Sequence, residues 1–117
     1  MRLFEGSEEF LRDFIHVADA VKINMHFYQT KSSGIFNAGT GKARSFTDIA
    51  RTMQDIQGRG EIEDIPFPKD LLGKYQKFTE ASLDNLRAAG YSEDFMSLEE
   101  GVRQYFDQLS SSDGFYI

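Results

Sequence analysis

Apolar residues recur at helical spacing in two long stretches of the chain. Phe46, Ile49, Ala50, Met53 and Ile56 follow a period of about 3.6 residues. Ser45, with Asp48 three residues later, forms a capping box at the start of this series, in which two polar side chains bond the free N–H groups of the first helical turn. Ser97 and Glu100 repeat this arrangement at the start of a second apolar series, Leu98, Val102, Tyr105, Phe106 and Leu109. The pattern predicts helices over about 45–57 and 97–109.

Shorter patterns fill the rest of the chain. Residues 12–17 are rich in aromatic and β-branched types and predict a strand, after which Asp19 is expected to cap a helix over about 20–29. Further short strands are expected at 35–38, 61–65 and around 76–78, and a short helix between Ser82 and Gly90. Ser110 to Ile117 is expected to be a frayed tail.

The order of these elements predicts a mixed α/β fold with few short strands and about four helices, in one portion spanning residues 1–117. Three or four short strands are fewer than a free-standing doubly wound sheet would have. The chain is therefore expected to be a piece of a larger domain.

The amino-acid composition of the chain argues against several kinds of binding partner and functional site. The chain of 117 residues has a net charge of -6, which opposes binding to nucleic acid or anionic membranes. It has no cysteine, so disulfides, thiolate metal sites and a cysteine nucleophile are excluded. The mean hydropathy is -0.45 and no apolar run approaches the length of a membrane helix. A cytoplasmic protein without nucleic-acid or membrane partners is expected.

The segment Gly39-Thr40-Gly41-Lys42 is the most conspicuous motif, because glycines between a strand and a helix can bind phosphate. A P-loop needs glycine at the position of Phe36 and serine or threonine at that of Ala43, and a dinucleotide fingerprint needs a small residue at Arg44. Both patterns fail, so we interpret the segment as a tight turn.

The titratable residues predict little chemistry. His26 is expected to be exposed on the polar face of its helix and His16 to be structural, so no metal site is predicted. The acidic residues lie at helix starts or in runs expected to face solvent, where solubility and the helix dipole account for them.

Arg12 has a stronger functional interpretation. Its guanidinium, close to the loop from Phe4 to Ser7, could clamp a diphosphate through paired hydrogen bonds. Gly6 would let backbone N–H groups approach a ligand, and the Ser7 hydroxyl adds a donor. The alternative is a surface ion pair with Asp13 or Glu9, and Tyr75 taken alone predicts a half-buried aromatic residue in a loop.

Several runs together resemble a known superfamily. Arg12-Asp13-Phe14-Ile15-His16-Val17-Ala18-Asp19 resembles the strand-to-helix junction of the extended short-chain dehydrogenase/reductases, in particular the nucleotide-sugar epimerases. Gly34-Ile35-Phe36-Asn37-Ala38-Gly39-Thr40-Gly41 resembles the strand and turn that follow it. Two later runs resemble the closing helices: Leu86-Arg87-Ala88-Ala89-Gly90-Tyr91 and Ser97-Leu98-Glu99-Glu100-Gly101-Val102.

Shorter runs narrow the resemblance to the bacterial ADP-glyceromanno-heptose 6-epimerase family: Leu3-Phe4-Glu5-Gly6-Ser7, Ile65-Pro66-Phe67-Pro68 and Gly73-Lys74-Tyr75-Gln76. It implies an isomerase that uses bound NADP to invert C6 of an ADP-heptose for the lipopolysaccharide core, and that assembles as a homo-oligomer. The substrate-binding residues that it implies here are Phe4, Glu5, Gly6, Ser7, Arg12 and Tyr75.

The sequence also departs from this family. The glycine-rich strand-turn-helix that binds NADP is absent, and so is the catalytic Tyr-x-x-x-Lys pair, since no tyrosine has a lysine four residues later. The resemblance therefore implies a C-terminal, substrate-binding portion without the N-terminal Rossmann half, without catalytic or cofactor-binding residues, and inactive alone. Two alternatives stay open: a stand-alone nucleotide-sugar binding module, and the substrate portion of a related UDP- or GDP-sugar epimerase or dehydratase.

Overall fold

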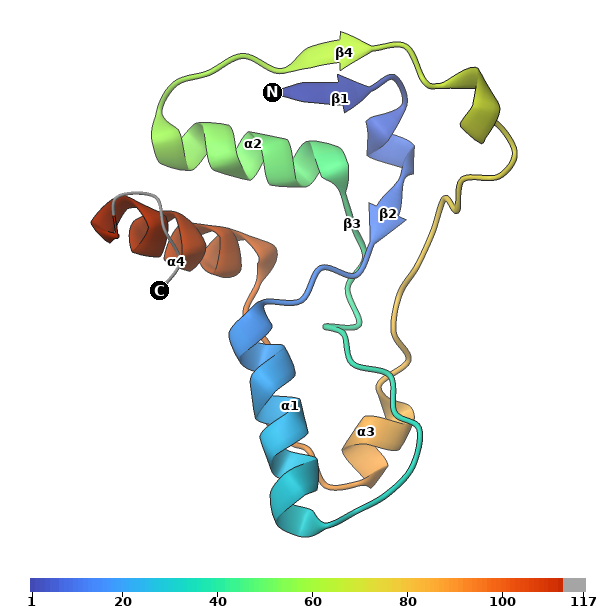
Figure 1. Cartoon of the computed structure of the whole chain (residues 1–117), viewed down its shortest axis with the longest axis vertical. Coiled ribbons are helices and arrows are strands. Elements are labelled where there is room, and N and C mark those ends of the chain that lie inside the picture. Colours follow the sequence, from blue (N-terminus) through green and yellow to red (C-terminus); the bar gives the residue numbers. More distant parts are fainter. Residues whose placement is uncertain (113–117) are drawn as a thin grey trace.

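The computed structural model describes residues 1–112 of the chain. These residues form four α-helices, which are joined by loops and short strands (Figure 1). In chain order the elements are β1 (Arg2–Phe4), the 3₁₀ turn η1 (Ser7–Glu9), β2 (Leu11–Arg12), α1 (Val17–Thr30), β3 (Arg44–Ser45), α2 (Phe46–Gln57), β4 (Glu63–Ile65), the 3₁₀ turn η2 (Lys69–Leu71), α3 (Asp84–Ala88) and α4 (Leu98–Ser111). The predicted class, α/β with four helices and few short strands, is confirmed.

The N-terminal segment pairs with three later parts of the chain. β1 runs parallel to β4, with Phe4 opposite Ile65. β2 runs antiparallel to β3, with Leu11 opposite Ser45, and Leu11 also forms a bridge to Phe78. These pairings bring residues 1–12 against segments that lie far away in the sequence.

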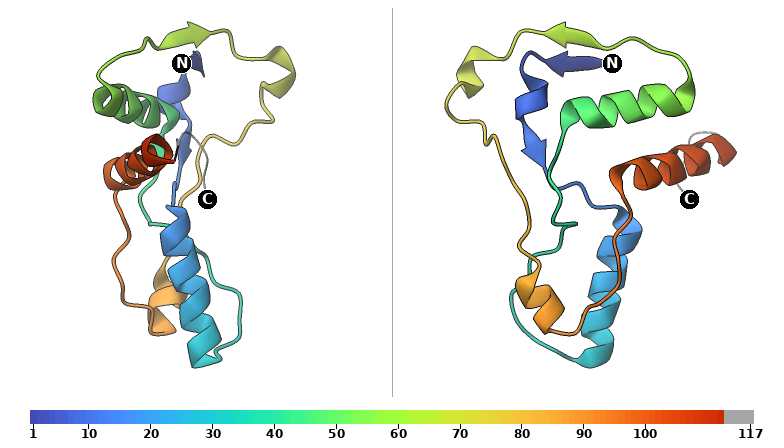
Figure 2. Two further views of the ribbon diagram at one scale, coloured as in Figure 1. Left: turned by 60° about the vertical axis from the view of Figure 1, so that its left-hand side comes forward. Right: turned by 180° about the vertical axis from the view of Figure 1, so that it is seen from behind.

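Helices α2 and α4 begin at the two predicted capping boxes. The Asp48 N–H donates to Ser45 Oγ at 3.0 Å, and the Glu100 N–H donates to Ser97 Oγ at 3.2 Å. The two helices lie side by side (Figure 2) and turn apolar side chains toward a shared groove of about 430 Å³. Ile49 and Met53 of α2 line the groove together with Val102 and Phe106 of α4.

The prediction for the first strand and helix was wrong in its boundaries. Only Leu11–Arg12 of that region is a strand, and α1 begins at Val17 with His16 as its N-cap, whose Nδ1 accepts from the Ala18 N–H at 3.2 Å. Asp19 lies inside the first turn of α1. It is fully buried and accepts a hydrogen bond from the Met96 N–H at 2.8 Å, so a distant segment determines its role.

The expected strand at 35–38 does not form, and Ile35 is 94% exposed. A strand needs a neighbour for its backbone N–H and C=O groups. No neighbouring strand reaches this segment within the described residues.

The hydrophobic core is small for the length of the chain. Ile23, Leu86 and Tyr91 form its buried cluster. The accessible surface is 8351 Å², whereas a folded monomer of this mass has about 6,500 Å². The radius of gyration is 16.7 Å, against about 13 Å for a closed domain. The fold therefore leaves much apolar surface uncovered.

The last helix continues further toward the C-terminus than its sequence pattern predicted. Of the tail expected at 110–117, Ser110 and Ser111 belong to α4, and residues 113–117 lie outside the described part. Within residues 1–112, none of the helices combines the length and the apolar character needed to cross a bilayer.

Candidate functional site

Four aromatic rings form a continuous row at the end of the molecule where β1 and β4 lie. Phe4 contacts Phe67 with ring centroids 5.3 Å apart, Phe67 stacks on Phe10 at 5.2 Å, and Phe10 meets the Tyr75 ring edge-on at 5.0 Å. A direct contact of 5.7 Å also joins Phe67 and Tyr75. We call these four residues the aromatic row. All four residues are half-buried, so part of the surface of each residue stays exposed.

Arg12 lies at the Tyr75 end of the aromatic row. Its guanidinium carbon is 5.2 Å from the centre of the Tyr75 ring, in a cation–π contact. Nη1 donates to the Leu11 carbonyl at 2.8 Å, and Nη2 donates to the Gln76 carbonyl. These bonds fix the direction of the guanidinium, and its other N–H donors have no hydrogen-bond partner among residues 1–112. The ion pair considered for Arg12 does not form with Glu9, which pairs with Lys77 at 3.3 Å.

The structure thus brings together three of the six predicted substrate residues: Phe4, Arg12 and Tyr75. The other three occupy the adjoining loop. Glu5 is exposed, and Gly6 has a positive φ of 76°, which only glycine adopts without strain. Ser7 is buried, and its Oγ lies 2.7 Å from Thr47 Oγ1 of α2. Its hydroxyl therefore anchors the loop to α2.

Phe10 and Phe67 are the members of the aromatic row that sequence reasoning did not single out. Phe67 lies in the run Ile65-Pro66-Phe67-Pro68, directly after β4. A signal existed, because that run carried part of the family resemblance and Phe10 stands two residues before Arg12. Their proximity could not be read from the sequence, since they lie 57 positions apart.

The Gly39-Thr40-Gly41 turn already holds an anion from its own chain. The Thr40 N–H donates to Asp13 Oδ1 at 2.7 Å, and the Gly41 N–H donates to Asp13 Oδ2 at 2.8 Å. A Cβ at Gly39 would lie 2.5 Å from Asp13 Oδ2, so glycine is needed for this close approach. Since the carboxylate takes the N–H groups that a phosphate would use, the interpretation of this motif as a tight turn is supported.

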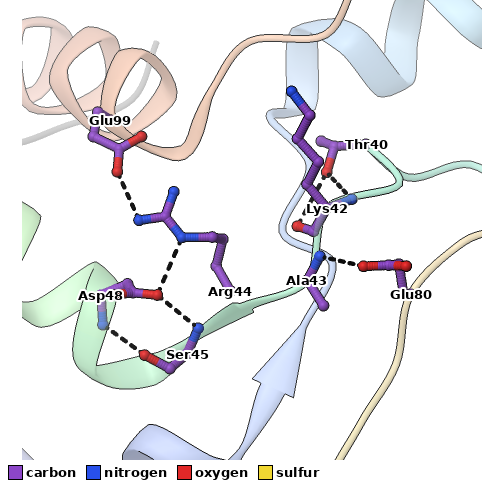
Figure 3. A network of polar contacts seen from close by, with 8 residues as sticks. All are labelled: Thr40, Lys42, Ala43, Arg44, Ser45, Asp48, Glu80 and Glu99. Carbon is purple, nitrogen blue, oxygen red and sulfur yellow. Dashed lines mark hydrogen bonds and ion pairs between the residues drawn. The ribbon is translucent and has the colours of Figure 1, made fainter.

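A polar network next to that turn joins α2 and α4 (Figure 3). Arg44 Nε donates to Asp48 Oδ2 at 3.1 Å, and its Nη2 donates to Glu99 Oε1 at 2.8 Å. The hydrogen bond from Arg44 lowers the pKa of Glu99. Arg44 therefore bonds a carboxylate at the start of each of these two helices and holds them together.

The two histidines are structural in the described residues. His16 caps α1, and His26 Nε2 lies 3.1 Å from the Ala89 carbonyl, packed against Tyr91. The expectation that His26 is exposed was therefore wrong, because α3 and the segment after it cover that face of α1. Residues 1–112 contain no group of three or more histidine or acidic side chains that could hold a metal ion.

Comparison with known proteins finds close relatives, although no family model matches. The chain is 50% identical over 118 aligned residues to the ADP-L-glycero-D-manno-heptose-6-epimerase of Brachyspira hyodysenteriae. The alignment takes in 100% of this chain and 37% of that protein, so the chain spans little more than a third of its relative's length.

Solved structures share the fold. The Helicobacter pylori ADP-L-glycero-D-manno-heptose-6-epimerase superposes with a TM-score of 0.79 at 26% identity, covering 95% of this chain and 33% of that one. The dTDP-glucose 4,6-dehydratase of Bacillus anthracis has the same TM-score of 0.79 at 14% identity, covering 98% and 36%. The second match, at so low an identity, concerns the fold alone.

The order of the motifs, the arrangement of strands and helices and the identity over the whole chain agree with one another. The chain belongs to the ADP-L-glycero-D-manno-heptose-6-epimerase family of extended short-chain dehydrogenase/reductases.

Proposed function

We propose that the chain is the substrate-binding portion of an NADP-dependent enzyme that inverts C6 of ADP-glycero-manno-heptose, a precursor of the lipopolysaccharide core. The observation that carries this proposal is the joining of Phe4, Arg12 and Tyr75 through one aromatic row. Aromatic faces suit the stacking of a nucleobase or the apolar face of a sugar. A guanidinium beside them suits a diphosphate.

The chain's share in the reaction is orientation of the substrate. No tyrosine is followed four residues later by lysine, so this chain offers no Tyr-x-x-x-Lys base. Bound NADP would exchange a hydride with C6. The residues here do not fit that cofactor, because the N–H groups of the Gly39–Gly41 turn bind Asp13. We therefore propose that a separate cofactor-binding portion supplies NADP and the catalytic base, and that the chain alone is inactive.

A face of α1 supports the existence of that second portion. Val17, Val21, Met25 and Tyr28 lie on one side of the helix with 54%, 53%, 47% and 78% of their surfaces exposed. The opposite side buries Ile23 in the core. A helix that is apolar on both sides is ordinarily covered on both sides. We infer that the cofactor-binding portion covers these four residues, called here the α1 stripe, and that the complete protein is a homo-oligomer.

Uncovered, the α1 stripe is expected to make the chain self-associate, because contiguous exposed apolar surface drives association. Glutamates in place of Val21 and Tyr28 are expected to weaken that association at least about tenfold, since they put charges into the contact. Sedimentation velocity over a concentration series measures the effect.

Leu72→Glu is the matched control, because Leu72 is 64% exposed in the loop after η2, away from α1. A second arm mixes the chain with the part of the Brachyspira relative that lies outside the alignment. The stripe variant should lose this complex and Leu72→Glu should keep it. Equal behaviour of the two variants in both arms would contradict the assignment of the stripe.

Calorimetric titration of the chain with ADP-mannose tests the proposed function, with NADP and UDP-glucose as parallel ligands. We expect ADP-mannose to bind and NADP to give no heat. Tighter binding of UDP-glucose would favour a related UDP-sugar enzyme. Activity with NADP and an ADP-heptose in the chain alone would overturn the proposed division of roles, and a folded chain that binds none of the three would overturn its substrate site.

A further inference from the structure

Phe67 is the ring through which the two halves of the candidate site meet. The Phe4–Ser7 loop lies at one end of the aromatic row, and Tyr75 with Arg12 lies at the other. Phe67 contacts Phe4 at 5.3 Å, Phe10 at 5.2 Å and Tyr75 at 5.7 Å. It therefore has ring neighbours on both sides of the site.

The backbone holds Phe67 in this place from one side. Phe4 and Ile65 are paired in the parallel β1–β4 register, and the Glu5 N–H continues it by donating to the Ile65 carbonyl at 2.9 Å. Pro66 and Pro68 flank Phe67 and restrict the backbone on both sides of it. The ring is thus presented by a constrained segment that is anchored to the Phe4 loop.

Tyr75 has no such strand pairing among the described residues. Its backbone N–H donates to the Leu71 carbonyl at 3.0 Å, in the turn that contains Gly73. Its ring is placed by Phe10 at 5.0 Å and by Phe67, and it in turn carries the Arg12 guanidinium at 5.2 Å. Since the bond to Leu71 holds only the backbone, the direction of the ring depends on its aromatic neighbours.

We propose that Phe67 is a positioning residue of the substrate site: it sets the Tyr75 ring, which packs on the Arg12 guanidinium, at a fixed distance from the Phe4–Ser7 loop. The proposal rests on the proposed function in so far as these residues bind a nucleotide sugar. Phe67 acts through Tyr75 and Phe10: its contacts hold the direction of the Tyr75 ring relative to Phe4.

The test compares Phe67→Leu with Phe67→Tyr, which keeps the ring. The first readout is the proton NMR spectrum of the Tyr75 ring, assigned by its loss in Tyr75→Phe. Neighbouring rings shift its signals, so Phe67→Leu should move them toward the values of a free tyrosine and should also move the Arg12 Nε–H signal. Phe67→Tyr should leave both signals close to wild type.

The second readout is affinity for ADP-mannose. Phe67→Leu is expected to weaken binding by up to about tenfold, the effect of losing one aromatic pair, and Phe67→Tyr to restore it. Phe36→Leu is the matched control, because Phe36 is also half-buried and stacks on Phe27 at 4.2 Å away from the aromatic row. It should destabilise the fold without moving either readout.

Unchanged Tyr75 and Arg12 signals in Phe67→Leu would overturn the proposal, as would equal loss of affinity in Phe36→Leu. If the wild-type chain does not bind ADP-mannose, the proposed substrate is wrong. The NMR comparison then still decides whether Phe67 places Tyr75, so the two failures are distinguishable.

Discussion

Replacing Arg12 by alanine is expected to weaken the binding of ADP-mannose by about ten- to a hundredfold, the range for hydrogen bonds to a charged group. The guanidinium is held in place by the Leu11 and Gln76 carbonyls and by the Tyr75 ring. Because it is already ordered, little conformational entropy is lost when its remaining N–H groups bind a diphosphate. Calorimetric titration at constant ionic strength measures the change.

Two substitutions sharpen this test. Arg12→Lys keeps the charge but loses the planar fork, so most of the affinity should still be lost. Arg87→Ala is the matched control, since Arg87 also donates to backbone carbonyls and lies 5.2 Å from the centre of the Phe95 ring. Its removal should leave affinity unchanged. A loss in Arg87→Ala as large as in Arg12→Ala would show that the effect comes from the fold and not from the site.

Local signals predicted the helix starts well. The capping boxes at Ser45 and Ser97 join groups only three residues apart, so their geometry is contained in the sequence. The start of α1 was not predicted correctly, because a contact with a distant segment determines it. Asp19 has the side chain of a good N-cap, but the Met96 N–H, 77 residues away, holds it inside the helix, and His16 takes the capping position.

In the candidate site too, single residues could be predicted from the sequence, but contacts between distant segments could not. Arg12 could be proposed from its chemistry, and Tyr75 only from the family resemblance. Phe67 and Phe10 could not be placed beside them, because the β1–β4 pairing joins segments about sixty residues apart. The strand expected at 35–38 failed for a related reason, since its sequence has strand character but the described residues provide no neighbour.

Asp13→Ala is expected to lower the free energy of unfolding by about 3 kcal/mol, because several bonds to one carboxylate are lost together. Its oxygens accept from the Thr40 N–H and Oγ at 2.7 and 2.5 Å, the Gly41 N–H at 2.8 Å and the Ala81 N–H at 3.0 Å. The carboxylate thus ties the segments around residues 13, 40 and 81 into one unit. Urea unfolding followed by far-ultraviolet circular dichroism measures the loss.

The same contacts predict an acid sensitivity. Burial acts to raise the pKa of Asp13, but the hydrogen bonds from Thr40, Ala81 and Gly41 outweigh it and the pKa is lowered from 3.8. A carboxyl with a lowered folded-state pKa contributes stability that is present above its unfolded pKa and is lost as the pH falls through the folded value. Stability should therefore fall below about pH 4, and more steeply in the wild type than in Asp13→Ala.

Asp13→Asn separates charge from shape. The amide fits the same space, but its NH₂ group cannot accept from a backbone N–H, so the variant should recover little of the lost stability. Glu100→Ala, which removes the exposed capping-box carboxylate of α4, is the matched control and should cost only about 1 kcal/mol. If Asp13→Ala cost no more than Glu100→Ala, the carboxylate would not be the tie between these segments. The Gly39–Gly41 turn would then be free to bind an external anion, and its interpretation as an internally filled turn would be wrong.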